Sequence, residues 1–187
     1  MNWKISLSII LIIILCKPSV RTGLEDSMIG QMLIQIPLLA ISGYLFGSGI
    51  RKRIDKIVSN FNSYGSLGLL LVVFTSTYWI LPRALDAALN SAFYETMKFL
   101  TVPLLIGLPL ALSWGKLPSI VKGFVWANLI SMQFVMGWLY AEAPIRLCNN
   151  YLTGQQVQLG KTLMALSLLL LFLFFCKAFF FGLKSKN

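Results

Sequence analysis

The stretch that decides the fold is TLMALSLLLLFLFFCKAFFFGL, residues 162–183. It holds a single charged residue, Lys177, among leucines and phenylalanines. A helix needs roughly 20 apolar residues to cross a hydrocarbon core of about 30 Å. This run is long enough, so it predicts a transmembrane helix.

Further apolar runs lie upstream, at residues 28–50, 66–81, 97–114 and 123–141, with a shorter one at Ile5–Cys16. Charged residues make up 12% of the chain and hydrophobic residues 57%, whereas a soluble domain needs roughly a quarter of its residues charged. We therefore predict an all-α fold, a polytopic transmembrane helix bundle with five long spans and a short N-terminal hydrophobic segment.

We expect two parts, residues 1–27 as an N-terminal signal or anchor segment with an external linker, and residues 28–187 as the bundle domain. The first apolar run has the length of a signal-peptide hydrophobic region. Pro18-Ser19-Val20 offers no convincing cleavage site after it. Removal and retention of this segment both stay open.

The chain carries 16 Lys and Arg against 6 Asp and Glu, and no histidine. The basic residues sit in short connections beside apolar runs, which is typical of juxtamembrane anchors and not of a nucleic-acid surface. One set of connections carries most of them, namely Arg51, Lys52, Arg53, Lys56, Lys116, Lys122, Lys184 and Lys186. The positive-inside rule then places 51–65, 115–122 and the C-terminus in the cytoplasm, and 17–27, 82–96 and 142–161 outside. We expect the membrane to be a bacterial inner membrane.

Polar residues inside the apolar runs indicate which helix faces point inward. Gln31 and Gln35 lie four apart and should face the bundle, because an amide facing lipid is unfavourable. Pro37 should kink that helix. Asn128 and Gln133 should mark an inward face of the fourth run. Lys98 lies near the start of the third run, and we expect it to snorkel to the interface.

Small residues and prolines add two local expectations. Gly43 and Gly47 predict a helix-packing face. Pro82 suits the start of a helix lying against the outer membrane surface, on which Arg83 and Asp86 are three apart and can pair.

Without histidine the chain lacks the usual general base and the commonest metal ligand, and we predict that it is not an enzyme. Sulfur offers an alternative, because thioethers and thiolates suit Cu(I). The doubtful ligands are Met28, Met32, Met97 and Cys148. The competing interpretation is that these methionines fill gaps between helices.

Three blocks resemble the CtaG family of polytopic cytochrome c oxidase assembly factors. They are MIGQMLIQIPLL at 28–39, WILPRALDAAL at 79–89 continuing to ETMKFL at 95–100, and GQQVQLG at 154–160 followed by Leu163-Met164. Where the family has histidines, this chain has Ile36, Ile80 and Thr96. The resemblance therefore implies a shared scaffold and the setting of haem-copper oxidase assembly, without the metal chemistry of those histidines.

The leading hypothesis is a non-enzymatic membrane accessory or assembly factor for a haem-copper respiratory oxidase, with oxidase subunits or a copper donor as partners beside membrane lipid. The expected external partner surface comprises Gln31, Gln35, Trp79, Pro82, Arg83, Asp86, Glu95, Arg146, Asn149, Asn150, Gln155 and Gln156. A Cu(I)-handling membrane protein and a small transporter are the alternatives.

Overall fold

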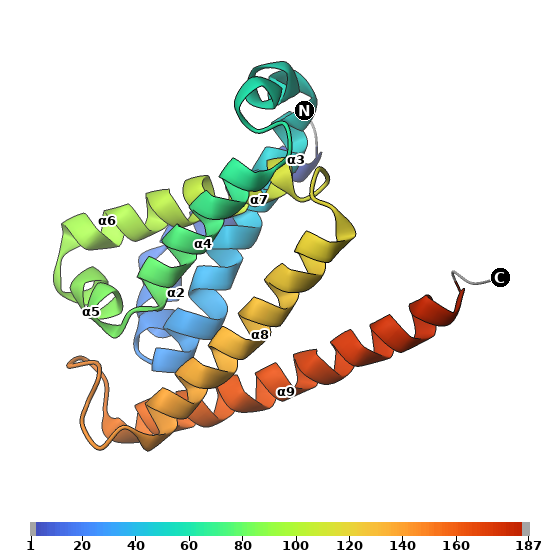
Figure 1. Cartoon of the computed structure of the whole chain (residues 1–187). Coiled ribbons are helices and arrows are strands. Elements are labelled where there is room, and N and C mark those ends of the chain that lie inside the picture. Colours follow the sequence, from blue (N-terminus) through green and yellow to red (C-terminus); the bar gives the residue numbers. More distant parts are fainter. Residues whose placement is uncertain (1–2, 185–187) are drawn as a thin grey trace. The chain divides into compact units, whose positions relative to one another are not determined.

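The computed structural model describes residues 3–184, and every regular element in that range is a helix. The elements are α1 (Trp3–Cys16), α2 (Pro18–Glu25), η1 (Gly30–Gln35), α3 (Ile36–Phe61), α4 (Ser66–Ile80), α5 (Pro82–Asn90), α6 (Ala92–Thr101), η2 (Val102–Gly107), α7 (Leu108–Ser113), α8 (Ser119–Glu142) and α9 (Thr153–Lys184) (Figure 1). The two elements labelled η are π-helical. The all-α prediction is confirmed for this range.

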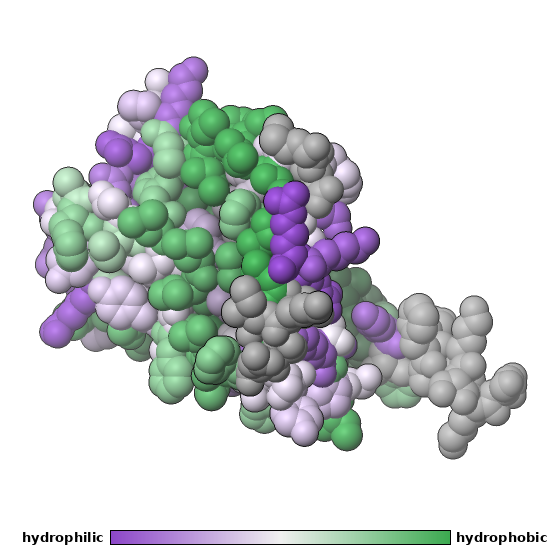
Figure 2. Space-filling view, turned by 90° about the horizontal axis from the view of Figure 1, so that it is seen from above, coloured by the Kyte–Doolittle hydropathy of each residue, from purple (hydrophilic) through white to green (hydrophobic). Residues whose placement is uncertain are grey.

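Four helices are long and apolar enough to cross a membrane, at Gly30–Ile54, Ala92–Ser113, Ser119–Glu142 and Thr153–Lys177. Figure 2 shows hydrophobic side chains over much of the visible surface, with hydrophilic side chains among them. The length and composition of the four helices are consistent with a multi-pass membrane protein. Among the basic residues behind the predicted orientation, Lys186 lies outside the described residues, as do the side chains of Lys56 and Lys184.

The predicted count of five long spans is not confirmed, because the run at 66–81 forms a short helix. Helix α4 has 15 residues and is followed at once by α5, bent from it by 71°. Pro82 stands at the first position of α5, as predicted, and Leu81 before it is extended. The helices α1 and α2 form a second bent pair, at 69°. In each bent pair the two helices are long and apolar enough to cross a membrane only when they are taken together.

The chain divides into two units, one made of Met1–Pro118 with Cys148–Tyr151 and the other of Ser119–Leu147 with Leu152–Asn187. In the first unit α3 packs against α1, η2 and α7. A buried apolar cluster that includes Leu15, Leu39, Trp79 and Val102 forms its core. The hydroxyl of Ser8 in α1 donates to the Ser42 carbonyl of α3 at 2.7 Å, in a buried position.

Glycine allows the backbones of α3 and η2 to touch. A Cβ on Gly43 would collide with the backbone of Pro103, and a Cβ on Gly107 would collide with the Ala40 carbonyl. Gly47 faces Leu108 and Ala111 in the same way. The predicted packing face at Gly43 and Gly47 is therefore confirmed.

Both π-helical segments end two residues before a proline. The Ile36 N–H donates to the Gln31 carbonyl before Pro37, and the Leu108 N–H donates to the Pro103 carbonyl before Pro109. A proline lacks the N–H that would continue the α-helical pattern, and a slip to bonds spanning five residues absorbs the defect. Where a kink is predicted at Pro37, the structure has a π-helical turn just before the proline, and this turn carries Gln31 and Gln35.

The second unit is a hairpin of α8 and α9. Near the connecting loop the helices touch through Gly137 and Gly160, where a Cβ on Gly160 would lie 2.6 Å from the Gly137 carbonyl oxygen. Gln156 fastens the loop, since its amide donates to the Tyr140 and Ile145 carbonyls and accepts from the Leu147 N–H. Within this unit Gln133 is half-buried, whereas Asn128 is exposed and does not face α9.

Candidate functional site

A fully buried lysine lies at one end of the first unit. Lys98 of α6 has no exposed side-chain surface, so the expectation that it snorkels is wrong. Its Nζ donates to Glu25 Oε1 at 2.7 Å and to Gln35 Oε1 at 2.8 Å. The Gln35 amide also donates to Glu25 Oε1, at 3.0 Å. Each of these three side chains thus contacts the other two, which is what keeps a buried charge stable.

A second ion pair joins the same two helices. Arg21 Nη1 lies 2.9 Å from Glu95 Oε1, close enough for an ion pair although not aligned as a hydrogen bond. Arg21 and Glu25 are four apart on α2, while Glu95 and Lys98 are three apart on α6. Each pair lies on one face of its helix, with the signs in opposite order. The two positive and two negative groups therefore match across the contact and cancel.

The loop between α8 and α9 reaches this network through Tyr151, which is buried. Its hydroxyl lies 2.7 Å from the Glu25 carbonyl and 2.9 Å from Gln31 Oε1. A phenol has one hydrogen to donate, and the buried Gln31 Nε2 has no acceptor among the described residues. Turning the Gln31 amide over satisfies both groups, since Gln31 then donates to Tyr151 and Tyr151 donates to Glu25. Burial, and after it the charge of Glu25, raise the pKa of Tyr151, so this donor keeps its proton.

Asp86 of α5 holds the adjoining part of the loop. Its carboxylate accepts the N–H of Asn149 at 2.7 Å, the N–H of Asn150 at 3.3 Å and the Asn150 side-chain amide at 3.1 Å. Among residues 3–184 no ion pair joins Asp86 to Arg83, which is exposed. The predicted pair between them is therefore wrong. Asp86 binds the loop in preference to Arg83 because its carboxylate accepts backbone N–H groups that an irregular loop would otherwise leave without an acceptor.

Cys148 is buried beside this contact. Its thiol lies 3.8 Å from the Pro82 carbonyl, and burial, with the Asp86 charge second, raises its pKa to about 12. A copper ion binds the thiolate, so metal binding here would require removal of a tightly held proton. Met28 is fully buried, and Met97 packs against the apolar core. The copper hypothesis stays a prediction.

The predicted partner residues fall into four groups, apart from Arg83, which is exposed. Gln31, Gln35 and Glu95 join the network around Lys98, while Pro82, Asp86, Asn149 and Asn150 form the neighbouring loop contact. Trp79 belongs to the core, where its indole N–H donates to the Thr101 hydroxyl at 2.9 Å. The remaining residues, Arg146, Gln155 and Gln156, belong to the second unit.

Four residues of this site were not predicted as part of it, namely Arg21, Glu25, Lys98 and Tyr151. A signal for the first three was present, because opposite charges stand four apart on one segment and three apart on another, in reverse order. For Tyr151 no such pattern exists. We call the group of Arg21, Glu25, Gln31, Gln35, Glu95, Lys98 and Tyr151 the Lys98 network.

Comparison with known proteins gives no assignment. No family model matches the chain, and no curated protein or solved structure matches it.

Proposed function

We propose that this chain is a non-enzymatic accessory protein of a membrane-bound haem-copper respiratory oxidase, and that it acts through the end of the first unit that carries the Lys98 network. The oxidase comes from the sequence resemblance. The observation that carries the proposal is that two of the resembling blocks meet in the structure. Gln35 comes from the first block and Asp86 and Glu95 come from the second, and all three belong to one continuous set of contacts.

The chemistry of this end fits a binding role. The charges of the Lys98 network neutralise one another, and their bonds join α2, η1, α6 and the loop at Tyr151. Asp86 fixes the backbone at Asn149 and Asn150, and both of these residues are exposed. A loop held in one conformation presents its amides to a partner with less ordering on binding.

The orientation belongs to the same proposal. The basic connections would lie in the cytoplasm, which places the Lys98 network and Asn149 on the external side. Oxidase subunits that are assembled from that side would then meet the loop from Cys148 to Tyr151. A copper donor is the other partner that this location would admit.

The test is removal of the gene, followed by optical spectra of membrane haems and measurement of oxidase activity. We expect both to fall, and to return with the wild-type gene. Unchanged haem spectra and unchanged activity in the deletion strain would reject the proposal.

A matched pair of variants then tests the surface. Asn149→Ala removes an exposed amide while the backbone bond to Asp86 remains, so the protein should stay at its normal level but restore less oxidase. Asn128→Ala changes the same residue type at an exposed position of α8 and should restore oxidase fully. Equal rescue by the two variants would argue against the loop as the contact surface.

A further inference from the structure

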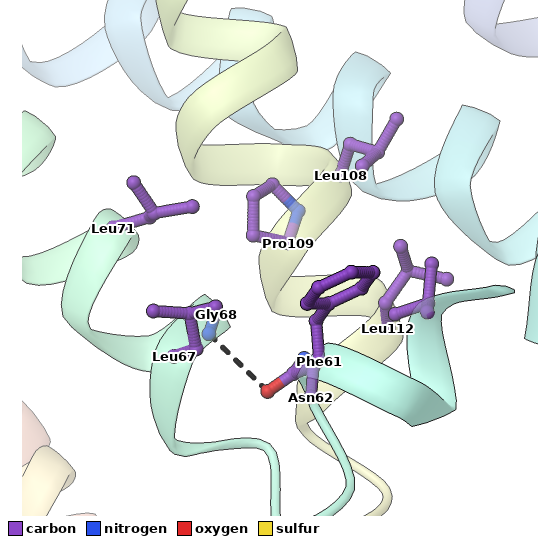
Figure 3. A pocket seen from close by; sticks show the side chains of 9 residues that line it. Phe61, Asn62, Leu67, Gly68, Leu71, Leu108, Pro109 and Leu112 are labelled. Carbon is purple, nitrogen blue, oxygen red and sulfur yellow. Dashed lines mark hydrogen bonds between the residues drawn. The ribbon is translucent and has the colours of Figure 1, made fainter.

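The other end of the first unit contains an open apolar pocket with a volume of about 230 Å³. The main lining side chains are Val58, Phe61, Leu67, Leu71, Leu108 and Leu112 (Figure 3). They come from the end of α3, the start of α4, and α7. The pocket is therefore built from three elements that are separated along the chain.

The polar groups at this pocket are already bonded. The Asn62 amide donates to the Ser113 hydroxyl at 2.8 Å and accepts the Gly68 N–H at 3.3 Å, the second of which is drawn in Figure 3. The pocket therefore presents an apolar surface to a ligand. Phe61 and Leu67 are exposed beside it, as residues that meet an acyl chain at the edge of a bilayer would be.

Two cations stand at the same end. Lys116 Nζ donates to the Asn62 carbonyl at 3.3 Å, and Asn62 lines the pocket. The Arg51 guanidinium lies over Gly115, where a Cβ would be 2.7 Å from Nη2. Gly115 and Lys116 follow one residue after the end of α7, which supplies Leu108 and Leu112 to the pocket. An apolar pocket and two cations are thus connected through one short segment of chain.

We propose that this end binds an anionic glycerophospholipid, with part of an acyl chain in the pocket and the phosphate against Arg51 and Lys116. The guanidinium matches the geometry of a phosphate, and the ammonium adds a second positive charge. The headgroup should carry net negative charge, because a zwitterionic headgroup brings its own cation toward Arg51 and Lys116. Exposed Tyr64 in the connection between α3 and α4 suits the headgroup level of a bilayer.

The experiment is native mass spectrometry of the purified full-length protein in detergent, with phosphatidylglycerol or phosphatidylcholine of identical acyl chains. We expect the wild-type protein to retain phosphatidylglycerol preferentially. The double variant Arg51→Gln/Lys116→Gln should lose this preference, with affinity falling about thirtyfold if each cation contributes as a juxtamembrane basic residue does.

The matched control is Lys52→Gln/Arg53→Gln, which removes the same charge from exposed residues of the same helix end. The control should keep the preference for phosphatidylglycerol. Leu71→Trp, which fills the pocket without a change in charge, should weaken binding of both lipids. An unchanged melting temperature will show that each variant is folded.

Two results would overturn the proposal. Equal retention of the two lipids by the wild-type protein would mean that the cations do not select the headgroup. An equal loss in the double variant and in its control would mean that attraction is spread over the whole basic surface, with no site at Arg51 and Lys116.

Discussion

The two ends of the first unit differ in the polar side chains that connect their helices. At one end the polar groups are charged, and the ion pairs Lys98–Glu25 and Arg21–Glu95 join α2 and α6. At the other end a single amide, Asn62, connects Ser113, Gly68 and Lys116 through its side chain and its carbonyl. The cost of removing one partner is larger where the partner left behind is a buried charge.

The comparison is sharpest at Lys98. Lys98→Met removes the cation 2.7 Å from the Glu25 carboxylate and leaves only Arg21, whose Nε lies 3.9 Å away. We expect a loss of about 3–5 kcal/mol in the free energy of unfolding. Thermal unfolding of the purified protein in detergent measures it. Lys161→Met, at an exposed position of α9, is the control and should unfold near the wild-type temperature.

The amide at the opposite end should matter less. Asn62→Ala leaves the Ser113 hydroxyl and the Gly68 N–H without this partner, and we expect a loss of about 1–3 kcal/mol. The same unfolding assay applies, with Asn128→Ala as the exposed control. A loss from Asn62→Ala that exceeds the loss from Lys98→Met would break the comparison between the two ends.

The contact between Asp86 and the loop is more exposed, so its effect should be smaller and local. Asp86→Ala removes the acceptor of the Asn149 and Asn150 N–H groups. We expect these amides to exchange with deuterium about fivefold to tenfold faster, which corresponds to roughly 1 kcal/mol. Arg83→Ala should leave the exchange unchanged, since Arg83 is exposed and not paired with Asp86. Unaltered exchange in Asp86→Ala would contradict the contact.

At neutral pH the Cys148 thiol should have the smallest effect on stability. Its pKa is about 12 in the folded protein, above the ordinary value of 9.0. Between these values the unfolded chain binds fewer protons, so the free energy of unfolding should decline as pH rises above about 9. At pH 8 we expect iodoacetamide to modify exposed Cys16 and to spare Cys148, read by peptide mass spectrometry. Equal modification of the two thiols would contradict this environment.

Local sequence patterns predicted several features of the first unit correctly. Gln31 and Gln35 are fully buried, as their spacing and the penalty for amides in lipid indicate, and Pro82 begins α5. The spacing of Gly43 and Gly47 also identified a real packing face. These expectations depend on residues close together in the chain, where helix geometry alone fixes which side chains share a face.

The errors concern partners that are distant in sequence. Lys98 is buried because Glu25 lies opposite it, 73 residues away. The charge spacing in each segment is visible in the sequence, but it does not say that the two segments meet. Asp86 turns to the backbone at Asn149, 63 residues away, in preference to its neighbour Arg83. At Pro37 the sequence predicts a kink. The π-helical form depends on which N–H each carbonyl before the proline accepts, as the Gln31 carbonyl accepts the Ile36 N–H.

The central claim is that Lys98 is buried because Glu25 pairs with it. The most direct measurement is a double-mutant cycle with Glu25→Gln, Lys98→Met and the double variant, each unfolded in detergent. We predict a coupling energy of about 1–3 kcal/mol, with the double variant more stable than Lys98→Met alone. Losses that add to within about 0.5 kcal/mol would contradict the claim, because residues that do not interact behave in that way.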